Sequence, residues 1–94
     1  MEYKFYKVSE VESIGDFNLK IKFENGITKV YDLKPLFDKW EIFKELKNNN
    51  LFEEVKVDTG GYGISWNDDI DLSCNELYEN GKECWKYHIR NNLK

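Results

Sequence analysis

The sequence contains few of the residues from which cross-links, metal sites and membrane anchors are built. It has two cysteines and one histidine in 94 residues. A secreted domain of this size usually carries more disulfide bridges and a signal peptide, so Cys74 and Cys84 are expected to be reduced thiols. The first residues, 1–5, lack the apolar stretch of a signal peptide, and no window approaches the roughly 18 apolar residues of a membrane span. These absences predict a cytoplasmic protein and exclude a membrane partner.

An excess of positive charge is also missing. Fourteen Lys and Arg oppose eighteen Asp and Glu, which gives a net charge of −4. Such a chain repels phosphate backbones on average, so nucleic acid is not the expected partner. Repeats, low-complexity runs and linkers are absent, and the length suits one core only. We therefore expect a single domain over residues 1–81, with residues 82–94 as a C-terminal tail packed on it.

Aromatic residues, in contrast, are abundant. The chain has six Phe, six Tyr and three Trp. Each ring contributes roughly 1.5–3 kcal/mol when it is fully buried. Rings can therefore stabilise a compact core without disulfides.

Residues 17–24 give the clearest local signal, because polar and apolar residues alternate strictly. This pattern predicts a half-buried strand. Its apolar face carries Phe17, Leu19, Ile21 and Phe23. Asn25 and Gly26 follow, and both tolerate the positive φ of a two-residue type I′ hairpin, so residues 27–33 are expected to return antiparallel.

That loop length also predicts a register for the hairpin. It pairs Phe23 with Thr28 and Ile21 with Val30 on the core face. Residues 3–11 contain alternating aromatic and β-branched residues and read as a preceding strand. Together the three segments predict a three-stranded antiparallel meander.

A helix is predicted after the meander. Asp32 can cap it, and Pro35 supplies a preset φ in its first turn. Apolar residues recur at helical spacing, so one face should cover the sheet. These residues are Leu36, Phe37, Trp40, Phe43 and Leu46. The asparagines at 48–50 end the helix.

The rest of the chain predicts a second hairpin and a second helix. Residues 52–58 and 64–66 read as strands joined by a glycine-rich tip. Ser73 and Glu76 have capping-box spacing, and Gly81 can close the helix that they start. The expected fold is α+β in two layers, with a three-stranded meander and a second hairpin covered by two or three helices.

In the tail, residues 82–94 combine two helical stripes. One stripe is basic and the other apolar, and they consist of Lys82, Lys86, Arg90 and Lys94 and of Trp85, Ile89 and Leu93. A helix that packs its apolar stripe inward is the simpler interpretation. If the core is complete without the tail, the stripe becomes a partner surface instead.

Several short phrases recur in an order typical of one family. They are Phe23-Glu24-Asn25-Gly26, Tyr31-Asp32-Leu33, Phe43 with Leu46, Phe52-Glu53-Glu54-Val55-Lys56-Val57-Asp58, Ile64-Ser65-Trp66, Asp71-Leu72 and Leu77-Tyr78. From about Tyr6 to Tyr78 the chain thus resembles the short bacterial domains of domain-of-unknown-function family 2442. The resemblance implies a two-layer fold of antiparallel strands covered by helices and no activity. It associates some members with toxin–antitoxin or regulatory gene pairs, by context rather than chemistry.

Two groups of residues suggest a metal or thiol site. Asp68, Asp69 and Asp71 could offer oxygen ligands to a hard cation, but the segment lacks the glycine and terminal glutamate of a calcium loop. Asp71 can instead hold the loop through backbone N–H groups. Cys84 and His88 lie one helical turn apart, yet a zinc site would need further ligands, and a thiol nucleophile would need an ordered base. We therefore assign no catalytic, cofactor or metal residue and expect no cofactor.

The loop at residues 60–63 could imitate a phosphate cradle, but it joins two strands rather than opening a helix, which favours a hairpin turn. Tyr62 at its tip is a candidate contact residue. Trp66 is expected in the core, near Leu77 or Tyr78.

The preferred hypothesis is a non-enzymatic protein-interaction module, an accessory or antitoxin-like partner of another small protein. Candidate contacts are Tyr62, Trp85 and Ile89, together with an exposed sheet edge. The partner can also be a second copy of the chain, which would make the protein a homo-oligomer. The alternative is a metal-dependent or thiol enzyme that uses the aspartates at 68–71 with Cys84 and His88. Nucleic-acid contact through the basic stripe is the weaker alternative.

Overall fold

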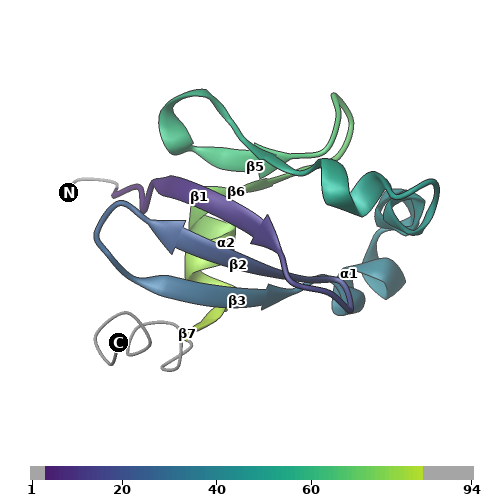
Figure 1. Ribbon diagram of the computed structural model, residues 1–94, viewed down its shortest axis with the longest axis horizontal. Coiled ribbons are helices and arrows are strands. Elements are labelled where there is room, and N and C mark those ends of the chain that lie inside the picture. Colours follow the sequence, from purple (N-terminus) through teal and green to yellow (C-terminus); the bar gives the residue numbers. More distant parts are fainter. Residues whose placement is uncertain (1–3, 84–94) are drawn as a thin grey trace.

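The computed structural model describes residues 4–83, which form two antiparallel sheets and several short helices (Figure 1). The first sheet has the strand order β1-β2-β3-β7, with β1 at Val8–Ser13, β2 at Asn18–Phe23, β3 at Thr28–Asp32 and β7 at Lys82–Glu83. The second sheet has the order β4-β5-β6, with β4 at Lys56–Val57, β5 at Gly63–Ser65 and β6 at Asp71–Ser73. The predicted α+β class and the three-stranded meander are confirmed, and β6 adds a third strand to the second hairpin.

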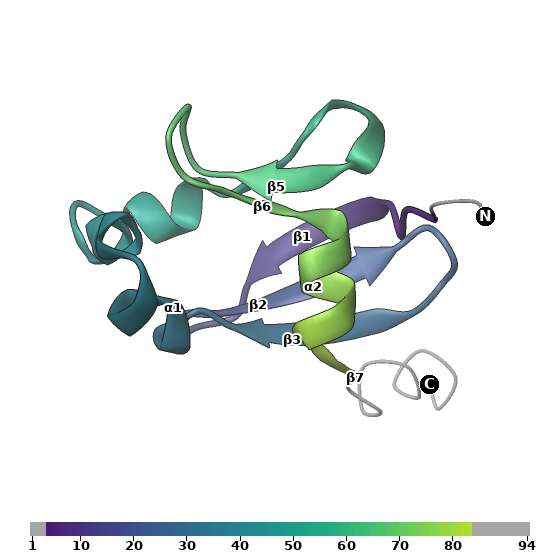
Figure 2. The same cartoon turned by 180° about the vertical axis from the view of Figure 1, so that it is seen from behind.

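The helices are α1 at Lys34–Lys39 and α2 at Cys74–Asn80, with 3-10 helices η1 at Glu41–Lys47, η2 at Leu51–Glu54 and η3 at Thr59–Gly61. Helix α2 crosses one face of the first sheet, and within the described chain no helix covers the opposite face (Figure 2). An antiparallel sheet can leave one face solvated in this way. Within residues 4–83, none of the helices is both long and apolar enough to cross a membrane.

The turn between β2 and β3 has three residues rather than two. Gly26 N–H donates to the Phe23 oxygen, and Phe23 N–H donates to the Ile27 oxygen, both at 2.9 Å. Gly26 has a φ of 92°, whereas Glu24 and Asn25 keep negative φ. A type I turn followed by a left-handed glycine is the usual three-residue hairpin loop. The predicted two-residue loop was therefore wrong by one residue.

This shift changes which side chains enter the core. Leu19 pairs with Tyr31, and Ile21 pairs with Lys29. Tyr31, at 5% exposed, therefore occupies the core position that had been predicted for Val30. Val30 lies on the open face, and Lys29 lies on the face that α2 covers. A one-residue slip moves every side chain of a strand to the other face.

The first strand also differs from its prediction. It begins at Val8 rather than at residue 3, and a bulge interrupts its pairing with β2 between Val8 and Glu10. Residues 4–7 precede it outside any ladder, and the Lys7 oxygen accepts a hydrogen bond from Glu24 N–H at 2.8 Å.

The predicted first helix breaks at Trp40. That residue has extended backbone angles, φ −132° and ψ 114°, and its side chain is 58% exposed. An unbroken helix would have kept Trp40 on the stripe of Leu36 and Phe43, but the extended residue turns the ring outward. The expected core position of Trp40 was therefore wrong. The rest of the stripe is buried, namely Leu36, Phe37, Phe43 and Leu46.

The start of α1 keeps Pro35 in its first turn, as predicted. The N-cap residue is Leu33, and no side chain caps it. Asp32, the residue before Leu33, accepts a hydrogen bond from Lys34 N–H at 3.0 Å. Although partial burial opposes ionisation, the bonds and charge of Lys34 lower the pKa of Asp32.

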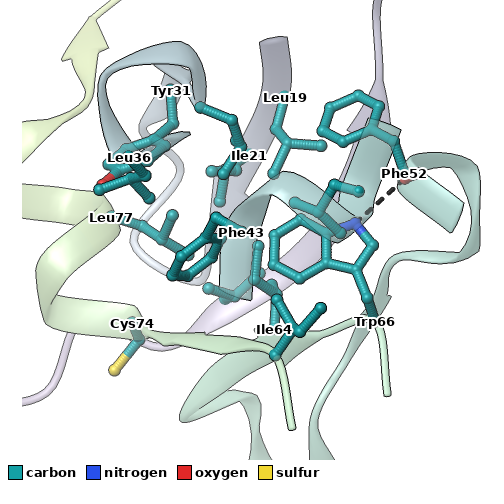
Figure 3. Packing of buried hydrophobic residues seen from close by; sticks show 14 of the residues in the cluster. Leu19, Ile21, Tyr31, Leu36, Phe43, Phe52, Ile64, Trp66, Cys74 and Leu77 are labelled. Carbon is teal, nitrogen blue, oxygen red and sulfur yellow. Dashed lines mark hydrogen bonds between the residues drawn. The ribbon is translucent and has the colours of Figure 1, made fainter. Parts of the chain in front are cut away.

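Trp66 lies in the core, as expected, in the same buried cluster as Leu77 (Figure 3). Its Nε1 donates to the Phe52 backbone oxygen at 3.1 Å. The Phe43 ring meets the Trp66 ring edge-on, with centroids 6.4 Å apart, and the Phe52 ring stacks on the Trp66 ring, with centroids 6.3 Å apart. Leu51–Glu54 forms η2 where a strand had been expected, which brings Phe52 to Trp66.

Helix α2 begins after Ser73 and ends before Gly81, as predicted, but only half of the capping box forms, because the Glu76 carboxylate accepts from Tyr31 and Asn80 rather than from Ser73 N–H. Ser73 Oγ accepts from Glu76 N–H at 3.1 Å, and Gly81 N–H donates to the Leu77 oxygen at 2.9 Å. A Cβ at Gly81 would lie 2.6 Å from that oxygen, so only glycine fits there. Lys82 and Glu83 pair with β3 as strand β7, at the point where a helical tail had been expected to begin. The remaining predicted helix, residues 84–94, lies outside the described residues.

Candidate functional site

Tyr62 stands on a tightly held loop between β4 and β5. Its backbone oxygen accepts from Cys74 N–H at 2.9 Å. Gly60 and Gly61 have φ of 82° and 81°, and a Cβ at Gly61 would lie 2.6 Å from the Val8 oxygen. Gly61 therefore serves a close approach to β1, which agrees with the hairpin interpretation. The Tyr62 ring remains 48% exposed on this fixed backbone.

A second exposed ring meets Tyr62 from the N-terminal segment. The Phe5 and Tyr62 rings are in edge-to-face contact, with centroids 5.2 Å apart and planes at 86°. Lys7 Nζ lies 4.9 Å from the centroid of the Tyr62 ring, within cation–π range. We call Phe5, Lys7 and Tyr62 the Phe5–Tyr62 patch. Sequence reasoning found Tyr62 alone, because the other two residues are remote in the chain.

The segment that carries Phe5 is held by α2. Asn75 Oδ1 accepts from Tyr6 N–H at 3.0 Å, and Asn75 Nδ2 donates to the Lys4 oxygen at 2.9 Å. Asn75 is 9% exposed. The Tyr6 ring stacks on Tyr78 with centroids 3.7 Å apart and planes at 2°. We call Asn75 and Tyr78 the α2 clamp, which sequence reasoning missed because Asn75 is hidden inside the capping-box sequence.

A groove of about 580 Å³ lies at the edge of β3 beside α1 and α2. Tyr31 donates its hydroxyl hydrogen bond to Glu76 at 2.7 Å, and Asn80 Nδ2 donates to the same carboxylate at 3.0 Å. Burial, followed by the bond to Glu76 and its charge, raises the pKa of Tyr31 far above its ordinary value. The Glu76 carboxylate thus accepts hydrogen bonds from two neighbouring side chains.

The acidic segment forms a turn between β5 and β6. Asn67 Oδ1 accepts from Asp69 N–H at 2.9 Å and from Ile70 N–H at 3.0 Å. This role had been assigned to Asp71, which instead lies in β6 opposite Ser65. Within residues 4–83, no three His, Cys, Asp or Glu side chains are grouped so that they could hold a metal ion.

Cys74 is buried, and its Sγ lies 3.5 Å from Asn75 Oδ1. The other proposed zinc and thiol residues, Cys84 and His88, lie outside the described residues. So do Trp85 and Ile89, which had been predicted as partner contacts. Those predictions remain untested.

A family model described as a protein of unknown function (DUF2442) matches residues 8–83. The match spans both sheets and α2, and the segment that carries Phe5 precedes it. Neither the curated proteins nor the solved structures include a match. Because the family match covers most of the chain, and agrees with the resemblance seen in its sequence phrases, this protein belongs to the DUF2442 family.

Proposed function

We propose that this domain is a non-enzymatic protein-interaction module and that the Phe5–Tyr62 patch is its contact surface. One observation carries the proposal: two aromatic rings, each 48% exposed, are fixed against each other by segments remote in the chain. Aromatic side chains are enriched at protein interfaces, and Tyr and Trp are enriched among the residues that contribute most binding energy. The partner is another protein, in the manner of an accessory or antitoxin-like pair.

The patch is preorganised for binding. The Tyr62 backbone is bonded to Cys74, and the residues on either side of Phe5 are bonded to Asn75. Ordering a free side chain on binding costs about 0.5–1.5 kcal/mol. Rings that are already in contact avoid part of that cost, which favours them as anchors.

Trp40 is a useful comparison, because it is 58% exposed and lies two positions before Ile42, which is 39% exposed. Within the described residues, no other ring packs against Trp40. Its side chain would therefore lose more rotamer freedom on binding than Tyr62 would. We regard Trp40 as the matched control for the patch.

Photocrosslinking in the native host cell tests the proposal. Benzoylphenylalanine replaces Tyr62 in one variant and Trp40 in a second variant, and cells that express each are irradiated. A discrete adduct is expected from position 62 but not from position 40, and Phe5→Ser should weaken it. An adduct of twice the protein mass would identify a second copy as the partner. Equal adducts at both positions, or none at position 62, would contradict the proposal.

A further inference from the structure

Residues 4–6 lie on the domain as a bound extended peptide would. The Asn75 amide contacts main-chain atoms of Lys4 and Tyr6, at 2.9 and 3.0 Å. In extended backbone, the carbonyl of one residue and the N–H of the second residue after it point to the same side. One amide side chain therefore replaces part of a neighbouring strand. Because both bonds go to main-chain atoms, other extended peptides offer the same groups.

Side-chain contacts alternate along the segment. The Tyr6 ring lies on Tyr78, and the Phe23 ring meets Tyr78 edge-on at 4.9 Å. The Phe5 ring lies instead against Tyr62. Main-chain bonds combined with pockets for alternate side chains are how protein surfaces recognise extended peptides. The clamp thus selects an aromatic side chain at the Tyr6 position.

The resident segment is suited to exchange. Residues 4–6 belong to no β-ladder, so they can leave the clamp without breaking a sheet. Opening removes two hydrogen bonds from the buried Asn75 amide, which is costly unless they are replaced. An incoming extended peptide with an aromatic residue restores both bonds and the ring stack. Exchange is therefore favoured over an empty clamp.

We propose that the α2 clamp is a binding site for an extended peptide of a partner protein that carries an aromatic residue at the Tyr6 position. Residues 4–6 occupy it as an intramolecular competitor. The inference rests on the proposed function, since it names the class of partner that the module accepts. The apparent affinity for that peptide is the intrinsic affinity multiplied by the fraction of molecules in which the clamp is not occupied by residues 4–6.

The test is an NMR titration of the isotopically labelled full chain with the synthetic peptide Glu-Tyr-Lys-Phe-Tyr-Lys, which copies residues 2–7. Tyr6→Ser in the full chain removes the competing ring stack. The peptide is expected to bind this variant up to about tenfold more tightly than wild type, since a ring pair contributes about 0.5–1.5 kcal/mol. The Asn75 side-chain amide and the Tyr78 signals should shift. A peptide with Ser in place of its second Tyr should bind the variant up to about tenfold more weakly, since it lacks the same ring pair.

Two further variants locate the site. In the Tyr6→Ser background, Asn75→Leu should abolish binding, and if that chain does not fold, Tyr78→Leu takes its place. Equal affinity for wild type and Tyr6→Ser, or shifts confined to other residues, would overturn the clamp. Absence of peptide binding by a folded Tyr6→Ser chain would do the same. If crosslinks form at position 62 but the peptide does not bind, the Phe5–Tyr62 patch is supported as a contact surface and the clamp is not a peptide site. If the peptide binds but no crosslinks form, the clamp is supported and the patch is not.

Discussion

Lys29 places its ammonium 3.9 Å from the centroid of the Tyr78 ring and donates a hydrogen bond to the Tyr78 backbone oxygen. That oxygen belongs to the last turn of α2, where carbonyls lack helical partners. Helix α2 has no basic residue in its own last turn. Lys29 therefore supplies, from β3, the positive charge that a helix C-terminus favours.

Lys29→Met keeps most of the side-chain volume but removes the charge and the donor. We expect the free energy of unfolding to fall by about 1–2 kcal/mol, from the lost cation–π contact and hydrogen bond. Urea denaturation measures this as a lower midpoint. Lys22→Met, on the exposed face of β2, is the control and should stay within about 0.5 kcal/mol of wild type. If both variants lose the same free energy of unfolding, the contacts of Lys29 with Tyr78 do not contribute to stability.

Gly61→Ala tests the close approach of the Tyr62 loop to β1. The new Cβ would lie 2.6 Å from the Val8 oxygen, at a φ of 81°. Gly26→Ala introduces a similar left-handed strain at φ 92° but meets nothing within 4 Å. We expect about 1–2 kcal/mol of destabilisation at Gly26 and clearly more at Gly61. Thermal unfolding of both variants checks the order, and a loss at Gly26 as large as at Gly61 would contradict it.

The sequence was sufficient for the buried face of β2 from Leu19 to Phe23 and for the Ser73 cap of α2, because both depend on neighbouring residues, whereas Phe17 precedes the strand with a left-handed φ of 58°. It was not sufficient for the hairpin register. Asn25-Gly26 suits a two-residue loop and also a three-residue loop with glycine last. Burial of Tyr31 and Leu33, at 5% and 0% exposed, accompanies the three-residue loop. The shorter loop would have turned these two side chains to the open face.

The candidate site was predictable only in part. Tyr62 stands out because glycines surround it, whereas Phe5 and Asn75 become significant only through contacts with remote segments. Asn75 and Tyr6 are 69 positions apart. No local pattern signals such a pair, since an asparagine inside a helix start and a tyrosine near the N-terminus are each unremarkable. The core position predicted for Trp40 was wrong for a related reason, because the extended backbone of this one residue turns its ring away from the buried stripe of the predicted helix.

Trp66→Phe tests the hydrogen bond at the centre of the core. The change removes the Nε1 donor and leaves the Phe52 oxygen without that bond in a buried position. We expect a loss of about 1–3 kcal/mol, with a further cost for the smaller ring. Trp40→Phe is the matched control, because Trp40 is 58% exposed, and it should change stability by less than about 0.5 kcal/mol. Similar urea midpoints for the two variants would contradict this assignment.

The Tyr31–Glu76 hydrogen bond predicts a loss of stability in alkaline solution. Burial, then the bond and charge of Glu76, raise the pKa of Tyr31 in the folded protein. An unfolded tyrosine loses its proton near pH 10. Above that pH the unfolded state binds fewer protons than the folded state, so the free energy of unfolding falls as pH rises. Below pH 10 the contribution is fully present.

Urea denaturation between pH 8 and pH 11.5 measures this contribution as a difference between variants. Once the pH exceeds about 10, Tyr31 should lower the free energy of unfolding by up to about 1.4 kcal/mol per pH unit. Tyr31→Phe removes the titrating group, so its stability should fall less steeply with pH over that range. Tyr62→Phe leaves Tyr31 in place and should keep the wild-type slope. If the slopes of Tyr31→Phe and wild type coincide, Tyr31 titrates alike in both states, and the hydrogen bond to Glu76 does not hold its proton.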